Sequence, residues 1–232
     1  MHSSGPLVTV GVPVRNGAGT LARALDSIVR QTYANLEIII SDNQSSDGTE
    51  AICRQYAARD SRIRYIRQLA PLGIIDNFRA PVDASRGEFF LWAAHDDVRD
   101  DNYVETLLRG FGRHPEASLC FGSVAEFSAP MSWNEAEPVQ HSFQTLGFTF
   151  VDFVRQQTRT ACAHVYGVIR TEHLRQYRWY QVDEGWDVVA LFWLAMRGPF
   201  VAEPATTLYY YRPPPGRSTH ERAVGNNFRP LS

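Results

Sequence analysis

Two adjacent carboxylates, Asp96 and Asp97, directly follow the apolar run at residues 89–93. Adjacent carboxylates at the end of a buried strand are suitable ligands for a hard divalent cation, Mg²⁺ or Mn²⁺, that also bridges to phosphate oxygens. A structural alternative is that Asp97 or Asp100 caps a helix beginning near Asn102. The position of the pair after a strand, in an alternating α/β pattern, favours the metal site over the cap.

A second polar cluster begins where the apolar run 36–40 ends, at Asp42. A carboxylate at the edge of a sheet can accept a hydrogen bond from a base N–H or a ribose hydroxyl. The alternative is a polar turn in which Asp47 or Thr49 caps the next helix. We favour the turn for residues 47–49 and a ligand-binding role for Asp42.

An acidic cluster at residues 183–187 opens an apolar stretch that we expect to be helical over 184–196. Acidic side chains in a first helical turn commonly interact with the helix dipole. They can also act as a general base that removes a proton from a hydroxyl group. The spacing does not decide between these two roles. We expect most of the scattered histidines to be surface or structural residues. His220, which follows a proline run, is a candidate metal ligand.

These polar clusters are separated by elements that alternate between strand and helix. Short β-branched or apolar runs predict strands, and apolar residues at helical spacing predict the helices between them. The predicted strands are 7–14, 36–40, 63–66, 89–93, 118–127 and 207–211. The predicted helices follow Thr20 and residue 49 and then occupy 75–84, 103–112, 148–156 and 184–196. We expect an irregular loop over the site at 128–145 and a loose polar tail from residue 216.

Alternation of strands and helices predicts βαβ units with a parallel sheet. Ligands of such sheets bind beyond the carboxyl ends of the strands. The polar clusters 15–16, 42–43 and 95–97 stand at three of those ends. We therefore expect them to converge in space although they lie far apart in the sequence.

The composition is that of an ordinary globular chain of one domain, with 232 residues and a net charge of −2. This charge argues against a protein that binds nucleic acid through general electrostatics. All 23 basic residues are arginine, which suits phosphate contacts but also follows from biased composition. Three isolated cysteines indicate neither a disulfide framework nor a metal site, so a reducing cytoplasm is expected. With no signal peptide or stretch of ~20 apolar residues evident, we expect a cytoplasmic protein, and peripheral contact with the inner face of a membrane stays open.

The segment VTVGVPVRNGAGTLARALDSIVRQTYANLEIIISDNQSSDGT, at residues 8–49, resembles the opening of the family 2 glycosyltransferases. The likeness continues through GIIDNF at 73–78 and GEFFLWAAHDD at 87–97, and is thinner at 187–198 and 208–212. The resemblance implies an α/β protein of the Rossmann-like GT-A fold, with a mostly parallel central sheet flanked by helices and a smaller C-terminal acceptor-side region. Residues 1–125 would then bind the nucleotide-sugar. Residues 126–232 would form the acceptor-binding and catalytic-base region of the same domain.

The resemblance also implies roles for individual residues. The nucleotide pocket would be lined by Pro13, Val14 and Asn16, with Asp42 on the base, usually uracil, and Asn77 nearby. His95, Asp96 and Asp97 take the place of the family's DxD motif, with Asp96 as the metal ligand. The usual first aspartate is Ala94 here, which moves metal and ribose contacts onto Asp96 and Asp97. Asp187 matches the catalytic base, with Glu184 and Asp183 as the next candidates, and Trp186 could stack on a sugar.

The implied reaction is an inverting transfer of a sugar from a nucleotide diphosphate sugar, usually a UDP-sugar, to a hydroxyl of a glycan or glycolipid acceptor. The implied pathway is the synthesis of cell-envelope polysaccharide or glycolipid. Mg²⁺ or Mn²⁺ would be the cofactor. One alternative is a sugar nucleotidyltransferase, although residues 15–19 are a poor version of the triphosphate-binding loop that it needs. Another is a non-catalytic nucleotide-sugar-binding protein, a less favoured alternative that Ala94 and the short C-terminal part leave open. The sequence leaves the donor sugar, the acceptor, the linkage and the oligomeric state open, and we expect acceptor specificity to reside in residues 128–180.

Overall fold

The apolar runs of the N-terminal half form four parallel strands in a computed structural model that describes residues 5–128, 138–139, 162–182 and 185–212. The central strand β1 pairs with β2 on one side and β4 on the other, and β3 lies beyond β2. Every residue of β1, β2 and β4 is buried, as expected for parallel strands covered on both faces. Their bounds are Val8–Val14 for β1, Leu36–Asp42 for β2, Ile63–Arg67 for β3 and Phe89–Trp92 for β4.

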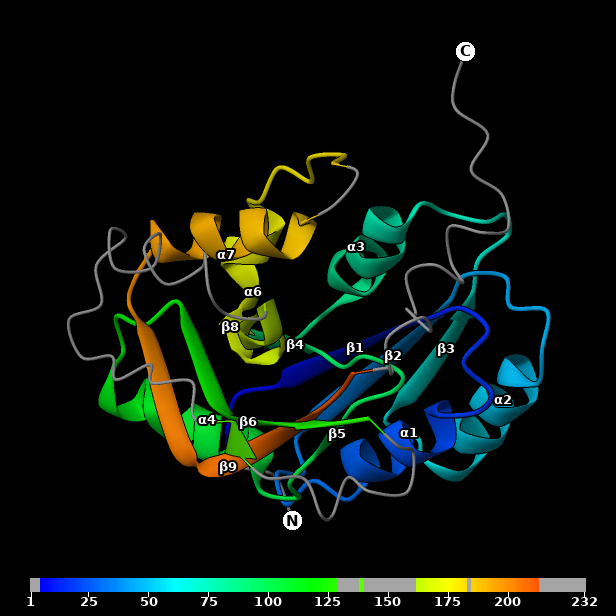
Figure 1. Cartoon of the computed structure of the whole chain (residues 1–232), viewed down its shortest axis with the longest axis horizontal. Coiled ribbons are helices and arrows are strands. Elements are labelled where there is room, and N and C mark those ends of the chain that lie inside the picture. The colour runs from blue at the N-terminus through cyan, green and yellow to red at the C-terminus, as the bar shows by residue number, and fades with distance from the viewer. Residues whose placement is uncertain (1–4, 129–137, 140–161, 183–184, 213–232) are drawn as a thin grey trace.

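Helices cover both faces of this sheet (Figure 1). One face carries α1 (Leu21–Val29), α2 (Thr49–Arg59) and α4 (Tyr103–Arg113). The other carries α3 (Ile74–Ala84), α6 (Thr171–Arg175) and α7 (Trp186–Ala195). Each helix that the sequence predicted within the described residues is present, with bounds that differ by one or two residues. The predicted helix at 148–156 and the tail from residue 216 lie outside the described part.

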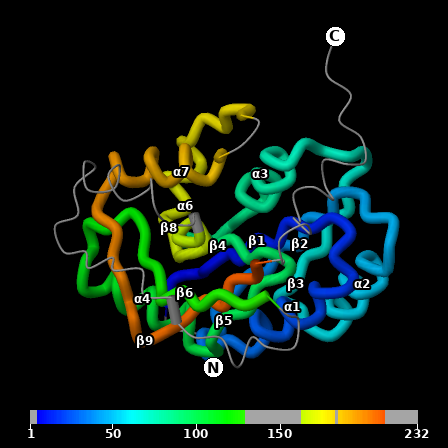
Figure 2. The backbone as a smooth tube through the Cα atoms, in the orientation of Figure 1, coloured from blue at the N-terminus to red at the C-terminus, as the bar shows by residue number. Residues whose placement is uncertain are grey.

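The C-terminal strands extend the same sheet, so both halves of the chain share it (Figure 2). The strand order is β3-β2-β1-β4-β8-β6-β9-β5, with β7 paired to β6. The pair β6·β9 is parallel, whereas β8 and β5 run antiparallel to their neighbours, so most strands keep one direction. The bounds are Val98–Arg99 for β5, Leu119–Phe127 for β6, Pro138–Val139 for β7, Val168–Arg170 for β8 and Phe200–Tyr211 for β9.

Strand β9 corrects one prediction, because it begins at Phe200 and not at residue 207. Its register against β6 shifts between Gly122, which pairs with Glu203, and Ser123, which pairs with Thr207. The intervening residues of β9 form a bulge that contains Pro204. Because a proline in a bulge removes no ladder hydrogen bond, the strand continues past it.

The region after β6 differs from the sequence prediction in two further ways. Residues Pro138–Val139 form β7 within the segment that we expected to be irregular over 128–145. The short helix η2 (Cys162–Tyr166), β8 and α6 were not predicted. These elements are too short to carry a clear periodic pattern, and their contacts with the sheet define them.

Two apolar clusters lie on opposite faces of the sheet, and alternate side chains of β4 contribute to each. Phe89 and Leu91 belong to the cluster with α1 and α4. Phe90 and Trp92 belong to the cluster with α3, α6 and α7. The strand that leads into Asp96 is therefore fixed from both sides, which gives the following carboxylates a rigid base.

Candidate active site

The loops after β1 and β2 contact each other, as the sequence predicted. The backbone N–H of Asn16 donates to Oγ of Ser45 at 2.9 Å, and the Asn16 Oδ1 accepts from the Ser46 N–H at 2.9 Å. Asn16 has a φ of 53°, a left-handed conformation that asparagine tolerates better than most residues. The Asn43 N–H also donates to the carbonyl of Val14. The two loops thus form one polar rim at the carboxyl end of the sheet, with Asn16 exposed on it.

Asp42 is fully buried and hydrogen-bonded to the protein through both carboxylate oxygens. Oδ1 accepts from the Ser45 N–H at 2.8 Å, and Oδ2 accepts from the Tyr65 hydroxyl at 2.7 Å. Burial raises the pKa of Tyr65, and the hydrogen bond to Asp42 raises it further, so the phenol stays a donor. Any base that contacts this carboxylate must therefore compete with Tyr65.

Asn77 lies near the first turn of α3 and connects that helix to β2. Its Oδ1 accepts a 2.7 Å hydrogen bond from Ser41, whose hydroxyl also accepts from the Gln68 side chain. Asn77 and Ser41 are both buried. The register of the sheet pairs Ser41 with Pro13 of β1, so Pro13, Asp42 and Asn77 belong to one neighbourhood.

His95 joins the loop after β4 to the start of α1. Its Nδ1 lies 3.0 Å from the Thr20 hydroxyl. Thr20 is the residue before α1, but its side chain does not cap the helix and contacts His95 instead. A Cβ at Gly17 would lie 3.1 Å from this imidazole and 2.7 Å from Val14 Cγ2. The glycine thus allows the first loop to pack closely against His95.

Asp97 is buried, and its Oδ1 accepts a 2.9 Å hydrogen bond from the backbone N–H of Tyr211 at the end of β9. Its Oδ2 is buried with no hydrogen-bond partner among the described residues. The capping alternative is wrong, because Asn102 is the N-cap residue of α4 and Asp100 accepts from the Thr207 N–H. Both carboxylates therefore bind β9, not the helix.

The carboxylate of Asp96 is partly exposed beside Asp97, and an arginine lies next to the pair. Arg23 of α1 donates a 3.0 Å hydrogen bond to the Asp96 carbonyl, and its guanidinium lies over the Phe127 ring. Burial lowers the pKa of Arg23, while Asp96, Tyr211 and Asp97 raise it. Burial raises the pKa of Asp97 well above its usual range, and the charge of Asp96 adds to the shift. A cation placed here would favour the ionised form of both carboxylates.

Asp187 lies in the first turn of α7, directly after Gly185, which has a φ of 76°, and Trp186. One of its carboxylate oxygens accepts from the Val188 N–H at 2.9 Å, so it does stabilise the helix start. The short helix η2, which ends at Tyr166, contacts both α7 and β4. The fold therefore brings the helix that carries Asp187 close to the strand that leads into Asp96 and Asp97. Asp183, Glu184 and His220 lie outside the described residues.

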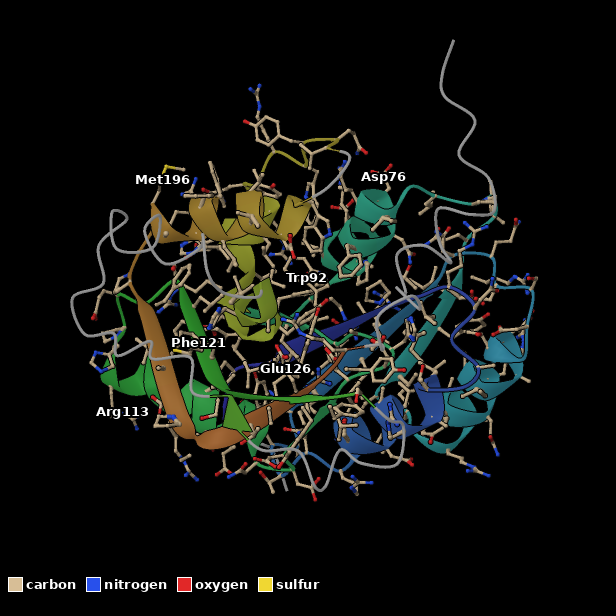
Figure 3. All side chains as sticks on the ribbon, viewed as in Figure 1. Asp76, Trp92, Arg113, Phe121, Glu126 and Met196 are labelled. Atoms are coloured by element: carbon tan, nitrogen blue, oxygen red, sulfur yellow. The ribbon has the colours of Figure 1, made fainter. Side chains whose placement is uncertain are left out.

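The ring of Trp186 packs in an aromatic cluster and joins α7 to α3 and β4. Its centroid lies 4.6 Å from Phe78, 5.5 Å from Trp92 and 6.5 Å from Trp179. Figure 3 shows Trp92 between α3 and α7, where its indole N–H donates to the carbonyl of Phe78. Much of the Trp186 ring is thus in contact with other aromatic side chains. The cluster also fixes the start of α7, the helix that carries Asp187.

The residues present fit a magnesium or manganese ion whose coordination is completed by substrate phosphates and water. Within the described ranges, no three histidine, cysteine or acidic side chains gather into a metal-binding group. Mg²⁺ does not require such a group, because it commonly binds one or two carboxylates together with substrate phosphates and water. Asp96 and the unpaired Oδ2 of Asp97 meet that requirement.

The comparison with known families identifies the chain. The family model described as "Glycosyl transferase family 2" matches residues 9–178, which is most of the chain. The protein belongs to this family. The matched region contains the predicted nucleotide pocket and both Asp96 and Asp97, whereas Asp187 lies beyond it. The family resemblance read from residues 8–97 is thus confirmed.

Family 2 relatives are known from several bacteria. Glycosyltransferase GlyA of Streptococcus pneumoniae serotype 4 is 31% identical over 147 residues, which cover 63% of this chain and 20% of GlyA. The putative glycosyltransferase EpsH of Bacillus subtilis is 34% identical over 123 residues, or 53% of this chain and 35% of EpsH. The chain thus spans about a fifth to a third of the length of these relatives.

The crystal structure of S. aureus TarS 1–349 in complex with UDP-GlcNAc has a TM-score of 0.73 against this family 2 chain. The two are 15% identical, and the match covers 96% of this chain and 62% of that chain. At this identity the likeness shows the fold alone, and it confirms the expected GT-A architecture. No helix within the described ranges is both long and apolar enough to span a membrane.

The sequence did not single out four residues that the structure places at this site: Arg23, Tyr65, Tyr166 and Tyr210. Arg23 and Tyr65 carry no motif, and only their contacts with Asp96 and Asp42 mark them. Tyr210 belongs to the run at 208–212 that resembles the family, but that likeness did not indicate which tyrosine faces the carboxylates.

Proposed function

We propose that this family 2 chain transfers a sugar, with inversion, from a nucleotide diphosphate sugar to a hydroxyl of a glycan or glycolipid. The observation that carries the proposal is the pair Asp96 and Asp97 beyond the carboxyl end of β4, with η2 in contact both with this strand and with α7, the helix that carries Asp187. Such a site would hold a diphosphate at one end and a base at the other, which sugar transfer requires.

The nucleotide would bind on the polar rim formed by the ends of β1, β2 and α3. Pro13, Val14 and Asn16 would line this pocket, with Asn77 beside it. Asp42 would accept from the base, and the hydroxyl of Tyr65 would be displaced, since Asp42 has no exposed surface. Uracil is the base that we propose, and the complexes of TarS with UDP and UDP-GlcNAc support it by analogy of fold.

The diphosphate would lie at the loop after β4. Asp96 and Asp97 would hold Mg²⁺ or Mn²⁺, with His95 against the nucleotide side of the loop and His220 as a further ligand. When bound, the cation supplies Lewis-acid neutralisation of the leaving diphosphate. The guanidinium of Arg23, bonded to the Asp96 carbonyl, keeps the loop in place and adds positive charge beside it.

Asp187 would be the catalytic base. It would take the proton of the acceptor hydroxyl while the oxygen attacks the anomeric carbon opposite the leaving diphosphate. Glu184 is the second candidate for this role.

The acceptor would bind to residues 126–232, and residues 1–125 would bind the donor. Cell-envelope polysaccharide or glycolipid synthesis is the pathway class that we propose, carried out in the cytoplasm at the inner face of the membrane.

The test is a calorimetric titration of UDP into the protein with Mn²⁺, repeated with EDTA. We expect binding that depends on the metal and that weakens about ten-fold or more in Asp42→Asn. Tyr65→Phe is the informative partner variant, because it frees the oxygen that the base would use and so leaves UDP affinity equal or higher. Equal weakening in both variants would mean that Asp42 supports the loop without contacting the base. Absence of binding to UDP, GDP and dTDP would reject the donor site.

A further inference from the structure

The tyrosines Tyr166 and Tyr210 lie side by side on two elements that border the acidic site. Tyr166 ends the short helix η2, and Tyr210 lies near the end of β9. Their ring centroids are 6.2 Å apart, with an angle of 39° between the planes. Both side chains are partly exposed. The two rings therefore form a continuous aromatic surface.

The fold holds Tyr166 between the elements that carry the proposed chemistry. Helix η2 contacts β4, which leads into Asp96, and α7, which carries Asp187. The hydroxyl of Tyr103 lies 3.4 Å from the Tyr166 carbonyl and fixes the backbone at this point. Tyr166 thus belongs to the element that joins the strand of the proposed diphosphate site to the helix of the proposed base.

Tyr210 is fixed from the other side by the neighbouring residue. The Tyr211 N–H donates to Asp97, so the end of β9 is attached to the acidic loop. In the register of the sheet, Tyr210 pairs with Glu126 of β6, which Figure 3 labels over the central strands. Tyr209 makes a different contact, a hydrogen bond from its hydroxyl to Asp100.

Neither the Tyr166 nor the Tyr210 hydroxyl hydrogen-bonds to another side chain or backbone group in the described ranges, although neither residue is fully exposed. A tyrosine phenol is protonated at neutral pH, so both hydroxyls can donate a hydrogen bond. Two neutral donors beside an aromatic surface match the chemistry of a pyranose ring, which offers hydroxyl acceptors and an apolar face.

We infer that Tyr166 and Tyr210 bind the sugar that is transferred, with their hydroxyls on its hydroxyl groups and their rings along one face. The inference rests on the proposed function, because the sugar must lie between its diphosphate at Asp96 and the attacking hydroxyl at Asp187. It assigns donor-sugar selectivity to η2 and β9, not to the nucleotide pocket.

The experiment measures the dissociation constants of UDP and of UDP-glucose, UDP-galactose and UDP-GlcNAc with Mn²⁺ for the wild type, Tyr166→Phe and Tyr210→Phe. GDP or dTDP and their sugars replace them if the wild type binds those instead. Loss of one neutral hydrogen bond is expected to weaken binding of the preferred nucleotide-sugar about three- to ten-fold in each variant. The affinity for the free nucleotide is expected to stay within about two-fold, because the nucleotide does not reach these hydroxyls.

Tyr209→Phe is the matched control, since it removes a hydroxyl from the adjacent residue that bonds to Asp100. It is expected to leave unchanged the ratio of the dissociation constant of the preferred nucleotide-sugar to that of the free nucleotide. An unchanged ratio in both Tyr166→Phe and Tyr210→Phe, with nucleotide binding intact, would overturn the inference while the proposed function stands. A wild type that binds no nucleotide at all would reject both.

Discussion

The backbone N–H of Tyr211 donates a 2.9 Å hydrogen bond to Oδ1 of Asp97. This bond attaches the end of β9, near the C-terminal limit of the described chain, to the loop that follows β4. It makes Asp97 a structural centre of the site, while its neighbour Asp96 keeps a partly exposed carboxylate. Asp97 therefore has a structural role, through Oδ1, that Asp96 does not share.

Replacing Asp97 by alanine should destabilise the protein. The change removes the acceptor of the Tyr211 N–H, and hydrogen bonds to charged groups contribute about 1.5–3 kcal/mol. Relief of a buried carboxylate with an unpaired oxygen offsets part of this, so we expect a loss of about 1–2 kcal/mol in the free energy of unfolding. Urea denaturation at pH 7 measures it, and Asp97→Asn, which keeps an oxygen acceptor, should lose less.

Replacing Asp96 by asparagine should abolish transfer without altering stability. The carboxylate makes no hydrogen bond to the described residues, so the free energy of unfolding is expected to change by less than about 0.5 kcal/mol. Loss of a metal ligand removes the charge that neutralises the leaving group. Donor hydrolysis assays with Mn²⁺, alongside denaturation, check both parts. Full activity in this variant would exclude Asp96 as a metal ligand.

Replacing Asp187 by asparagine should lower the turnover number about 10²- to 10⁴-fold, the usual contribution of a general base, and leave UDP affinity unchanged. The control is Glu105→Gln, which removes a first-turn carboxylate from α4 on the opposite face of the sheet. Both variants lose a favourable interaction with a helix dipole, and Glu105→Gln also weakens contacts with Thr32 and Arg109, so the control should lose at least as much stability as Asp187→Asn. Equal activity in the two variants would leave Asp187 with only its helix-stabilising role.

Two glycines of the first loop provide a test of the packing against His95. A Cβ at Gly17 would lie 2.7 Å from Val14 and 3.1 Å from His95, whereas a Cβ at Gly19 has no atom within 4 Å. We expect Gly17→Ala to cost about 1–3 kcal/mol and to weaken UDP binding, because the loop and the imidazole must move apart. Gly19→Ala should keep wild-type stability and affinity. Thermal denaturation and UDP titration of the two variants measure stability and affinity. Equal stability and equal UDP affinity in Gly17→Ala and Gly19→Ala would contradict the prediction.

The buried Glu37 at the far end of the sheet should make stability depend on acid pH. Burial raises its pKa, but hydrogen bonds from the Arg86 N–H, the Thr9 hydroxyl and the Arg86 side chain outweigh burial and lower it overall. Because the pKa is lower in the folded state, the stabilisation is present above the ordinary value near 4.5 and is lost as the pH falls through the lowered value. Glu37→Gln should therefore be less stable at pH 7 and show a flatter stability profile between about pH 5 and 3. Denaturation across this range measures it, with the exposed Asp83→Asn as the control.

Local patterns in the sequence determined most of the N-terminal half. The β-branched run at residues 8–14 indicates a buried strand, and the spacing of Leu21, Leu25 and Ile28 indicates one face of a helix. Both signals lie within a few consecutive residues. The convergence of the loops after β1, β2 and β4 then followed from topology, because parallel strands end at the same edge of a sheet. The family resemblance lay in the same region, since its motifs are contiguous.

Only the tertiary structure decided which residues of the site are exposed, paired or neighbours. The sequence alone does not distinguish the roles of Asp96 and Asp97. In the structure, Asp97 accepts a hydrogen bond from Tyr211, 114 residues later, and Asp96 does not. The approach of Tyr166, Tyr210 and Asp187 likewise depends on β8 and on the bulged β9, whose pairings join segments distant in sequence. Such contacts depend on long-range strand pairing, which periodicity within a short window does not encode.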